Sequence, residues 1–361
     1  MSRSQRPLSR PATPFGIAVV VLGAVLAGCS ASNPAPPTTQ AAQREPSATT
    51  TAVKPTSYIT PQRRLDVGGC PLFPVDNAFH ATVTGLRARS DSSTVIAAMG
   101  GRNLKVRPAF SAGVWEGSRS GIPVNVVDSR KAQSVDFVGG TYAYMSDLED
   151  HPIPDKPRFE GWPGIAWDRH LLVVDSATCE SSEFFHVTPP WEDAKHRWLT
   201  ETAVKVDLRS NIPSTHGTAT ASGTSMLAGM IRYDEVASGA LNHVVGVSVP
   251  EIRKGDPVWP TTKSDGRSAN AETPQMGTWL RLRSTADLSQ LGAQAKVVAK
   301  ALQTHGAVIV DTNKSGIALS GEPDERWDDK DIKTLGVLSA SDFEVVDPAP
   351  MMISSSTHQI R

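Results

Sequence analysis

Trp279-Leu280-Arg281-Leu282-Arg283 alternates strictly between leucine and a larger polar or aromatic residue. Because successive side chains of a β-strand point to opposite faces, this stretch predicts a strand that buries both leucines. The second face of that strand is polar and aromatic. We therefore take Trp279 and Arg281 as candidate substrate-binding residues.

Similar short runs of apolar and β-branched residues, bounded by Gly, Pro, Asp and Asn, recur along the chain. They predict further strands at residues 124–127, 134–138, 170–175, 183–187, 204–208, 244–249 and 307–310. Capping residues and helical spacing predict only a few helices, at residues 91–99, 288–305 and 328–336. The expected fold is a single large, mainly β domain, a β-sandwich or jelly roll with a few peripheral helices.

The N-terminus has the parts of a lipoprotein leader. Three arginines (Arg3, Arg6 and Arg10) precede an apolar run at residues 15–27, and Leu26-Ala27-Gly28-Cys29 forms a lipobox. We expect a signal peptide over residues 1–28 and acyl chains, palmitate among them, on Cys29. Two or more such chains would hold the protein on the extracytoplasmic face of the cell membrane without a spanning helix.

The rest of the chain divides by composition. Residues 29–64 are rich in Pro, Thr, Ala and Ser and contain too little apolar surface to offset ordering entropy, so we expect a disordered tether. Residues 65–347 contain all eight tryptophans and are expected to form the globular domain. The tail, residues 348–361, is expected to be loosely ordered.

Net charge and cysteine content limit the classes of partner and of site that the chain can have. Removal of the leader takes away three arginines and no acidic residue, which changes the formal net charge from −1 to −4. This balance does not favour a nucleic-acid partner. After export, Cys70 and Cys179 would meet an oxidising compartment, and we expect them to form a disulfide. Neither cysteine has ligand spacing for zinc, so no metal or cofactor is predicted.

Familiar catalytic motifs are missing from the sequence: there is no nucleophile elbow, S-x-x-K dyad, H-E-x-x-H or Walker loop. Ser225, in a Ser-rich stretch near His216, is interpreted as a loop residue and not as a nucleophile. The acidic run at residues 324–331 lacks the spacing of a calcium loop, and acids that favour a helix N-terminus explain it better.

Two groups of ionisable residues stand near predicted strand ends. Asp168 and His170 lead into the strand at 170–175, where they form either a site or an ion-paired turn. Glu183 shares a face with apolar side chains, which would raise its carboxyl pKa as a general acid requires, unless it is a solvated edge residue.

The second group surrounds a predicted turn at Ser238-Gly239. Arg232 and Asp234 precede the turn, and His243 follows it. These residues could form a proton-transfer site, a sugar site or a salt-bridged hairpin. The salt-bridged hairpin is the simplest interpretation.

The order of several short stretches resembles a family of exported bacterial proteins, many without an assigned activity. The matching stretches are FPVDNAFH, GIPVNVV, HPIPDKPRFEG, WDRHLLVVD, CESSEFF, MIRYDEV, LNHVVGVSVP, VWP, PQMGTWLRLR and GEPDERWDDKDI. The resemblance implies an extracytoplasmic β-rich domain, and it brings no established substrate. The chain departs from the family pattern at Ala78-Phe79-His80 and at Lys263, so no role is transferred to those positions.

Together these features favour a carbohydrate-active enzyme, a glycoside hydrolase or polysaccharide lyase acting on envelope glycan. We take Glu183, Asp234, His170 and His243 as catalytic candidates, and Asp168, Arg232, Arg281 and Trp279 as substrate-binding candidates. The alternative is a non-catalytic envelope lipoprotein that binds glycan or protein. An enzyme requires the acids and histidines to share one cleft, whereas a binding protein does not.

Overall fold

The structure, a computed structural model, describes residues 57–59, 66–164 and 167–361. The predicted signal peptide, the lipidation site Cys29 and most of the predicted tether lie outside these residues. The described residues belong to one compact unit.

The larger of two main sheets has six strands. Their order is β18 (Phe343–Val345), β15 (Trp279–Leu282), β16 (Ala307–Thr312), β14 (Val245–Val249), β17 (Ile317–Leu319) and β3 (Val106–Pro108). β14 runs parallel to β16 and β17 runs parallel to β3, while the other neighbouring pairs are antiparallel.

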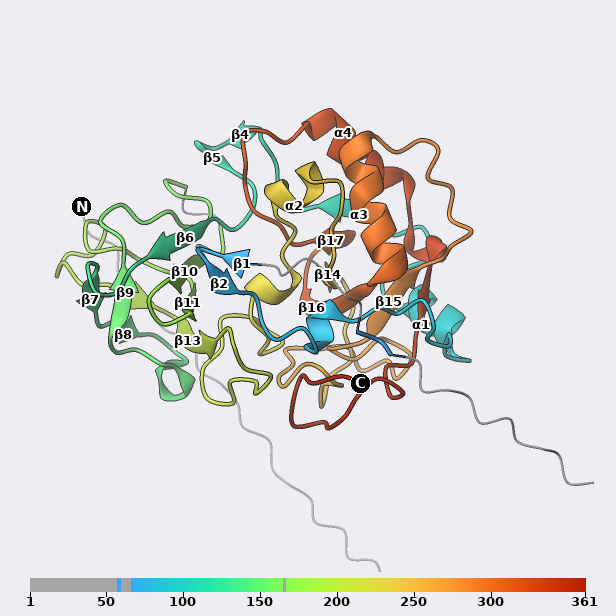
Figure 1. Ribbon diagram of the computed structural model, residues 1–361, viewed down its shortest axis with the longest axis horizontal. Coiled ribbons are helices and arrows are strands. Elements are labelled where there is room, and N and C mark those ends of the chain that lie inside the picture. Colours follow the sequence, from blue (N-terminus) through green and yellow to red (C-terminus); the bar gives the residue numbers. More distant parts are fainter. Residues whose placement is uncertain (1–56, 60–65, 165–166) are drawn as a thin grey trace, which may run out of the picture. The chain divides into compact units, whose positions relative to one another are not determined.

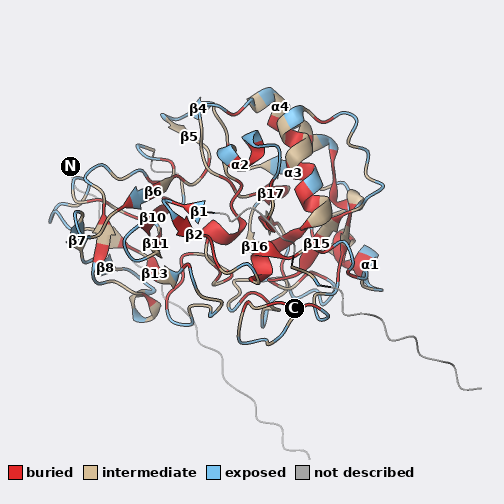
Figure 2. Ribbon diagram, viewed as in Figure 1, coloured by how far each residue is buried: buried red, intermediate tan, exposed pale blue. Residues whose placement is uncertain are grey.

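Alternation along β16 shows how this sheet comes to be buried on both faces. Ala307 and Ile309 pack into a core shared with helix α3 (Ala293–Thr304), whereas Val308 and Val310 pack into a second core on the opposite face. Figure 2 shows the buried residues along β15 and β16 and along one side of α3. A strand covered on both faces needs a continuous apolar run, as found here.

The smaller sheet has four strands, in the order β13 (Thr202–Asp207), β11 (Glu180–Phe185), β10 (Leu171–Asp175) and β6 (Val124–Val127). In β10, Leu172 and Val174 join Val308 in the second core, so the two sheets face each other across it (Figure 1). Leu171 and Val173 enter a third core on the outer side. The predicted mainly β fold, consistent with a sandwich, is confirmed.

Small elements surround the two sheets. Short strands form the pairs β1 (Asp66–Val67) with β2 (Cys70–Pro71), β4 (Val114–Trp115) with β5 (Ser118–Arg119), β7 (Gln133–Val135) with β9 (His151–Ile153), and β8 (Val138–Gly139) with β12 (Leu199–Thr200). The 3₁₀ helices are η1 (Ala78–His80), η2 (Ala143–Met145), η3 (Leu227–Gly229), η4 (Thr334–Val337) and η5 (Ala340–Asp342).

The helices match the predictions in part. α1 (Ser92–Ala98) and α4 (Asp329–Lys333) lie where they were expected. α3 begins later than residue 288, because Gly292 is its N-cap. α2 (Tyr233–Ala237) replaces the expected hairpin. No helix in the described part of the chain is long and apolar enough to cross a bilayer.

Two predicted strands have different bounds. The stretch 134–138 is divided between β7 and β8, which pair with different partners. The strand expected at 183–187 occupies Glu180–Phe185, because His186 has a φ of 58°, which a regular strand does not contain.

The predicted disulfide is present. Cys70 and Cys179 are joined by an S–S bond of 2.10 Å across 109 residues of sequence. The bond links β2 to the turn between β10 and β11. A loop of this length can stabilise the fold by about 4 kcal/mol through the entropy of the unfolded chain.

The C-terminal tail is not loosely ordered, contrary to the prediction. Met351 and Ile360 are buried in the second core, and the His358 ring contacts the Pro260 carbonyl oxygen at 2.9 Å. The Ile360 N–H donates to the Asp76 carbonyl. The two apolar anchors and the paired backbone explain the order, which the polar composition of the tail had concealed.

Candidate functional site

Two adjoining cavities are lined by residues of both sheets and by loops that contain residues 218–226 and 263–267. Their volumes are about 560 and 130 Å3, and they share Asp168, His170, Thr220 and Asp311 as lining residues. We call the two together the Asp–His cleft. The larger volume is within the range of small-ligand sites.

The start of β10 directs two side chains into this cleft. Both Asp168 and His170 line the cleft, on either side of Arg169, whose φ of 56° interrupts the extended backbone before β10. Arg169 points away: its Nε donates to the Val187 carbonyl at 2.8 Å, and its Nη2 donates to Glu192 at 2.7 Å. The strand entrance thus supplies an acid and an imidazole, while its arginine is structural.

A β-bulge brings a third ionisable group to the cleft. Val247 of β14 pairs with Ile309, and Ser248 pairs with Asp311, so that Val310 is the extra residue. Strict alternation would send the Asp311 side chain toward the helices, together with Ile309. Bulges redirect side chains, and both Val310 and Asp311 line the cleft.

Glu160 orients the His170 imidazole. His170 Nδ1 donates to Glu160 Oε2 at 2.7 Å, and the ring contacts Phe185 with centroids 5.5 Å apart. Among the described residues Nε2 has no hydrogen-bond partner. Burial lowers the pKa of His170, but Glu160, then Asp168 and Asp311, outweigh it, and the net shift is upward. The neighbouring carboxylates thus favour the protonated form of the imidazole.

Asp311 is the most perturbed carboxyl of the cleft. Burial, with a smaller contribution from Asp265, raises its pKa to about 7, although its Oδ1 accepts a hydrogen bond from the Thr312 N–H at 2.7 Å. Asp265 Oδ2 accepts from the Thr312 hydroxyl at 3.0 Å, while its buried Oδ1 has no partner. Near neutral pH Asp311 therefore exchanges between acid and carboxylate, as a general acid must.

Glu183 lies beneath the cleft and does not line it, which corrects its expected catalytic role. The side chain is completely buried, and it accepts hydrogen bonds from the Met226 N–H at 2.8 Å and from the Ser225 and Ser181 hydroxyls. Burial raises its pKa, as predicted. A carboxyl with no access to a substrate cannot protonate it. Glu183 instead holds the loop that carries Ser225.

His243, Arg232 and Asp234 do not reach the cleft lining either. Glu235 on α2 lies between Arg232 Nε, at 3.1 Å, and His243 Nε2, at 3.4 Å. We call these three residues the Glu235 cluster. Burial would raise the pKa of Glu235, but His243 and then Arg232 lower it to about 2. Asp234 points outward, 80% exposed, and pairs with Arg326.

The predicted pair of Glu183 and Asp234 is therefore wrong. The first is enclosed between the sheets, and the second is on the solvent side of α2. Two carboxyls that do not line a common cavity cannot flank one glycosidic bond.

Trp279 and Arg281 are structural and do not bind substrate. Trp279 is 1% exposed and stacks on Trp259 with centroids 5.9 Å apart. Arg281 pairs with Glu344 at 2.7 Å and donates to the carbonyl oxygens of Val83 and Leu86. The face that the sequence suggested was open is covered by the chain from residue 83 to 86.

The remaining motifs have structural roles, as interpreted. Ser225 donates to Glu183, and His216 pairs with Asp147 at 3.0 Å, so the two do not form a catalytic dyad with each other. In the acidic run, Asp328 caps α4, and Asp331 accepts from the first N–H groups of α3 at 2.9 and 3.1 Å.

Sequence reasoning missed Glu160, Asp265 and Asp311. Asp311 follows a strand that was predicted to end at Val310, and acids at strand ends are a usable signal. Glu160 and Asp265 stand in loops, and nothing in the sequence places them next to His170 or Asp311.

Among the residues that the structure describes, no three His, Cys, Asp or Glu side chains are arranged to hold a metal ion. The cleft is lined by acid–base groups and hydrogen-bonding side chains. Comparison of the chain with protein-family models, with curated proteins and with solved structures found no match.

Proposed function

We propose that this protein is an extracytoplasmic glycoside hydrolase that cleaves a cell-envelope glycan. The enzyme itself is held at the membrane by a lipid anchor at Cys29. The observation that carries the proposal is that Asp168, His170 and Asp311 line one open cavity. Glycoside hydrolysis requires two carboxyl groups that differ in protonation, and the two aspartates have unlike environments.

Asp311 is the proton donor in the proposed reaction. Its raised pKa keeps a large fraction protonated near pH 7. The carboxyl transfers its proton to the glycosidic oxygen as the bond from that oxygen to the anomeric carbon breaks. Asp168, which is exposed, takes a proton from the attacking water, whose hydroxyl group bonds to the anomeric carbon. The leaving sugar thus gains the proton of Asp311, the anomeric carbon gains the hydroxyl group of the water, and Asp168 holds the second proton of the water. Proton exchange with solvent then returns both carboxyls to their starting states.

His170 positions and polarises the substrate. Glu160 fixes the ring by accepting a hydrogen bond from Nδ1. The other ring nitrogen, Nε2, has no hydrogen-bond partner among the described residues and is available to a substrate. A protonated Nε2 donates to a sugar hydroxyl or carboxylate. The lining aromatic residues Tyr142 and Phe185 supply apolar surface for a sugar ring.

The test is glycan cleavage by the purified full-length protein, with a panel of bacterial envelope polysaccharides and peptidoglycan. We expect new reducing ends, and we expect Asp311→Asn to lower kcat by about 10²- to 10⁴-fold. Asp256→Asn is the matched control, because Asp256 is exposed and does not line the cleft. Unsaturated products would replace the hydrolase by a lyase, and cleavage that survives Asp311→Asn would remove the site.

A non-catalytic glycan-binding lipoprotein is the second candidate, and one observation favours it. Trp115, Trp162 and Trp191 are exposed by 58%, 44% and 54%. Large exposed aromatic side chains commonly mark binding surfaces. Absence of cleavage by folded protein, together with retained glycan binding, would select this function.

A further inference from the structure

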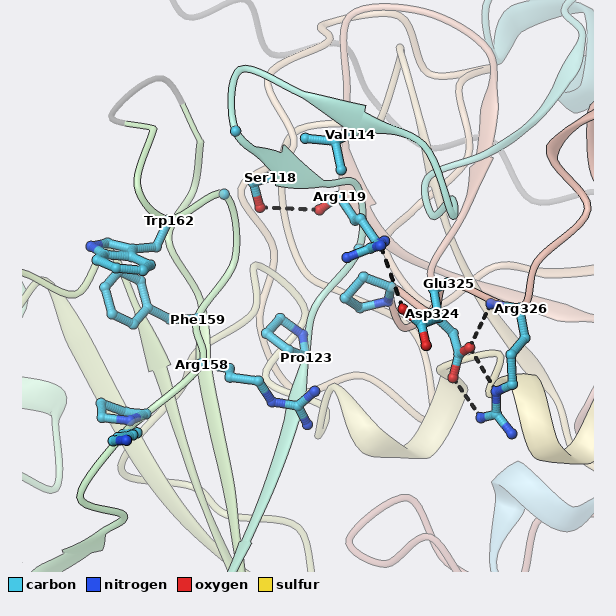
Figure 3. A pocket seen from close by; sticks show the side chains of 16 residues that line it. Val114, Ser118, Arg119, Pro123, Arg158, Phe159, Trp162, Asp324, Glu325 and Arg326 are labelled. Atoms are coloured by element: carbon cyan, nitrogen blue, oxygen red, sulfur yellow. Dashed lines mark hydrogen bonds and ion pairs between the residues drawn. The ribbon is translucent and has the colours of Figure 1, made fainter.

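A second cavity lies on the other side of the wall that carries Glu160. Its volume is about 670 Å3, and it is lined by the β4–β5 hairpin and by residues 156–162 and 323–326. Figure 3 shows Trp162 and Phe159 on one side and Glu325 and Arg326 on the other. We call this cavity the tryptophan groove.

The groove and the Asp–His cleft share a wall. Phe159 and Gly161 line the groove, while Glu160 between them lines the cleft. In the same way Gly121 and Pro123 line the groove and Ile122 lines the cleft. A ligand in the groove therefore lies one chain thickness from the Glu160–His170 pair.

Of the cationic side chains that line the groove, two are paired with carboxylates of described residues and two are not. Arg326 is neutralised by Asp324 and Asp234 at 2.6 and 2.9 Å, and Arg119 pairs with Glu325 at 3.7 Å. The Arg158 guanidinium donates only to the Val124 carbonyl oxygen, at 2.7 Å.

Lys156, like Arg158, is exposed, and neither has a carboxylate partner in the part of the chain that the structure describes. Two positive charges that line the same cavity thus remain available to an anion.

Trp162 supplies a fixed aromatic surface in the same cavity as these charges. Its Nε1 donates to Glu192 at 3.1 Å, and its ring lies 6.0 Å from that of Phe159. An indole held at its edge and exposed on a face loses little entropy when a ligand stacks on it. The face of a sugar ring, with its C–H groups, is a suitable partner for such a surface.

We propose that the tryptophan groove binds an anionic glycan, with a sugar ring against Trp162 and a carboxylate or phosphate group at Arg158 and Lys156. The proposal rests on the proposed function for the class of polymer, and it adds the charge of that polymer. It concerns binding alone, so it can fail or succeed independently of cleavage in the Asp–His cleft.

Isothermal titration of the full-length protein tests this proposal. The probes are tetragalacturonate for a carboxylate, glucose 1-phosphate for a phosphate and maltotetraose as the neutral counterpart. We expect at least one anionic probe to bind at least about tenfold more tightly than maltotetraose, and the stronger anion to identify the charged group.

Arg158→Gln and Trp162→Ala should each weaken that binding about tenfold or more. The matched controls are Arg87→Gln, an exposed arginine, and Tyr144→Ala, an exposed aromatic residue, neither of which lines the groove. Each control should stay within about twofold of the wild type. Because Arg158 is exposed, its substitution leaves the fold intact, which a melting curve verifies.

Three results would overturn the proposal: no binding of either anion, equal binding of maltotetraose, or anion binding that Arg158→Gln and Trp162→Ala leave unchanged. Cleavage of a neutral glycan, without binding of either anion, would support the hydrolase proposal and contradict the proposal of an anionic ligand in the groove. Binding without cleavage would retain the groove and reject the hydrolase.

Discussion

The Asp–His cleft and the Glu235 cluster contain the same kinds of side chain in opposite electrostatic states. In the cleft, Asp311 faces other acids and burial raises its pKa to about 7. In the Glu235 cluster, a histidine and an arginine surround one carboxylate and lower its pKa to about 2. The first arrangement lines a cavity, while the Glu235 side chain is only 8% exposed.

This difference separates a reactive site from a structural ion pair. A carboxylate matched by cations stays ionised at every physiological pH and has no proton to give. A carboxyl among other carboxyls keeps a proton and can transfer it. Residue type alone therefore does not distinguish the two regions, but the balance of charge and the access to solvent do.

The largest effect should come from breaking the Glu235 cluster. Glu235→Ala leaves Arg232 and His243 without their buried partner, and we expect a loss of about 3–5 kcal/mol in the free energy of unfolding. Urea denaturation measures it. Asp234→Ala is the matched control on the same helix, and it should cost less than about 0.5 kcal/mol, because its side chain is exposed. Equal losses of unfolding free energy in the two variants would show that the substitutions destabilise α2 itself and that the ion pair contributes little.

A smaller effect should follow from loosening the imidazole of the cleft. Glu160→Gln removes the charge that raises the pKa of His170, so that pKa should fall, and catalysis should drop about tenfold. NMR titration of His170, together with the pH profile of cleavage, measures both changes. If the His170 titration stayed in place, Glu160 would be a structural neighbour and not a positioning residue.

The smallest effect concerns stability and pH. The folded pKa of Asp311 is raised to about 7 from an ordinary value of 3.8. The wild type therefore loses stability as pH rises from about 4 to about 7, because ionisation favours the unfolded chain. Asp311→Asn should abolish this loss. Relative to the wild type, its free energy of unfolding should therefore be about 1 kcal/mol more favourable at pH 8 than at pH 4, a modest difference because the carboxyl lines an open cavity.

Thermal melts at both pH values test this expectation. The Glu235 cluster should behave in the opposite way: the contribution of its lowered pKa is present above about 4.5 and is lost as pH falls toward 2. A pH-independent effect of Asp311→Asn would contradict the assigned state of the cleft.

The sequence predicted the strands more accurately than the residues at their ends. A continuous apolar run predicted β10, and the sequence placed Asp168 and His170 together at its start. Alternation along β16 would direct Asp311 to the other face, but a bulge adds one residue and reverses the face. No local pattern announces that bulge, since it depends on how β14 and β16 pair.

Burial was the second quantity that local patterns could not supply. The polar face of Trp279 and Arg281 looked open in sequence, but the chain at residues 83–86 covers it. Glu183 was placed correctly on an apolar face, yet whether that face borders a cavity or the interior is decided by the opposite sheet. Long-range packing, not secondary structure, thus determined which candidates are accessible.

The order of the C-terminal tail has one more consequence. The Tyr58 N–H donates to the Arg361 carbonyl oxygen at 3.1 Å, so two residues far apart in the sequence are joined backbone to backbone. This contact ties the C-terminal tail to the segment that precedes β1.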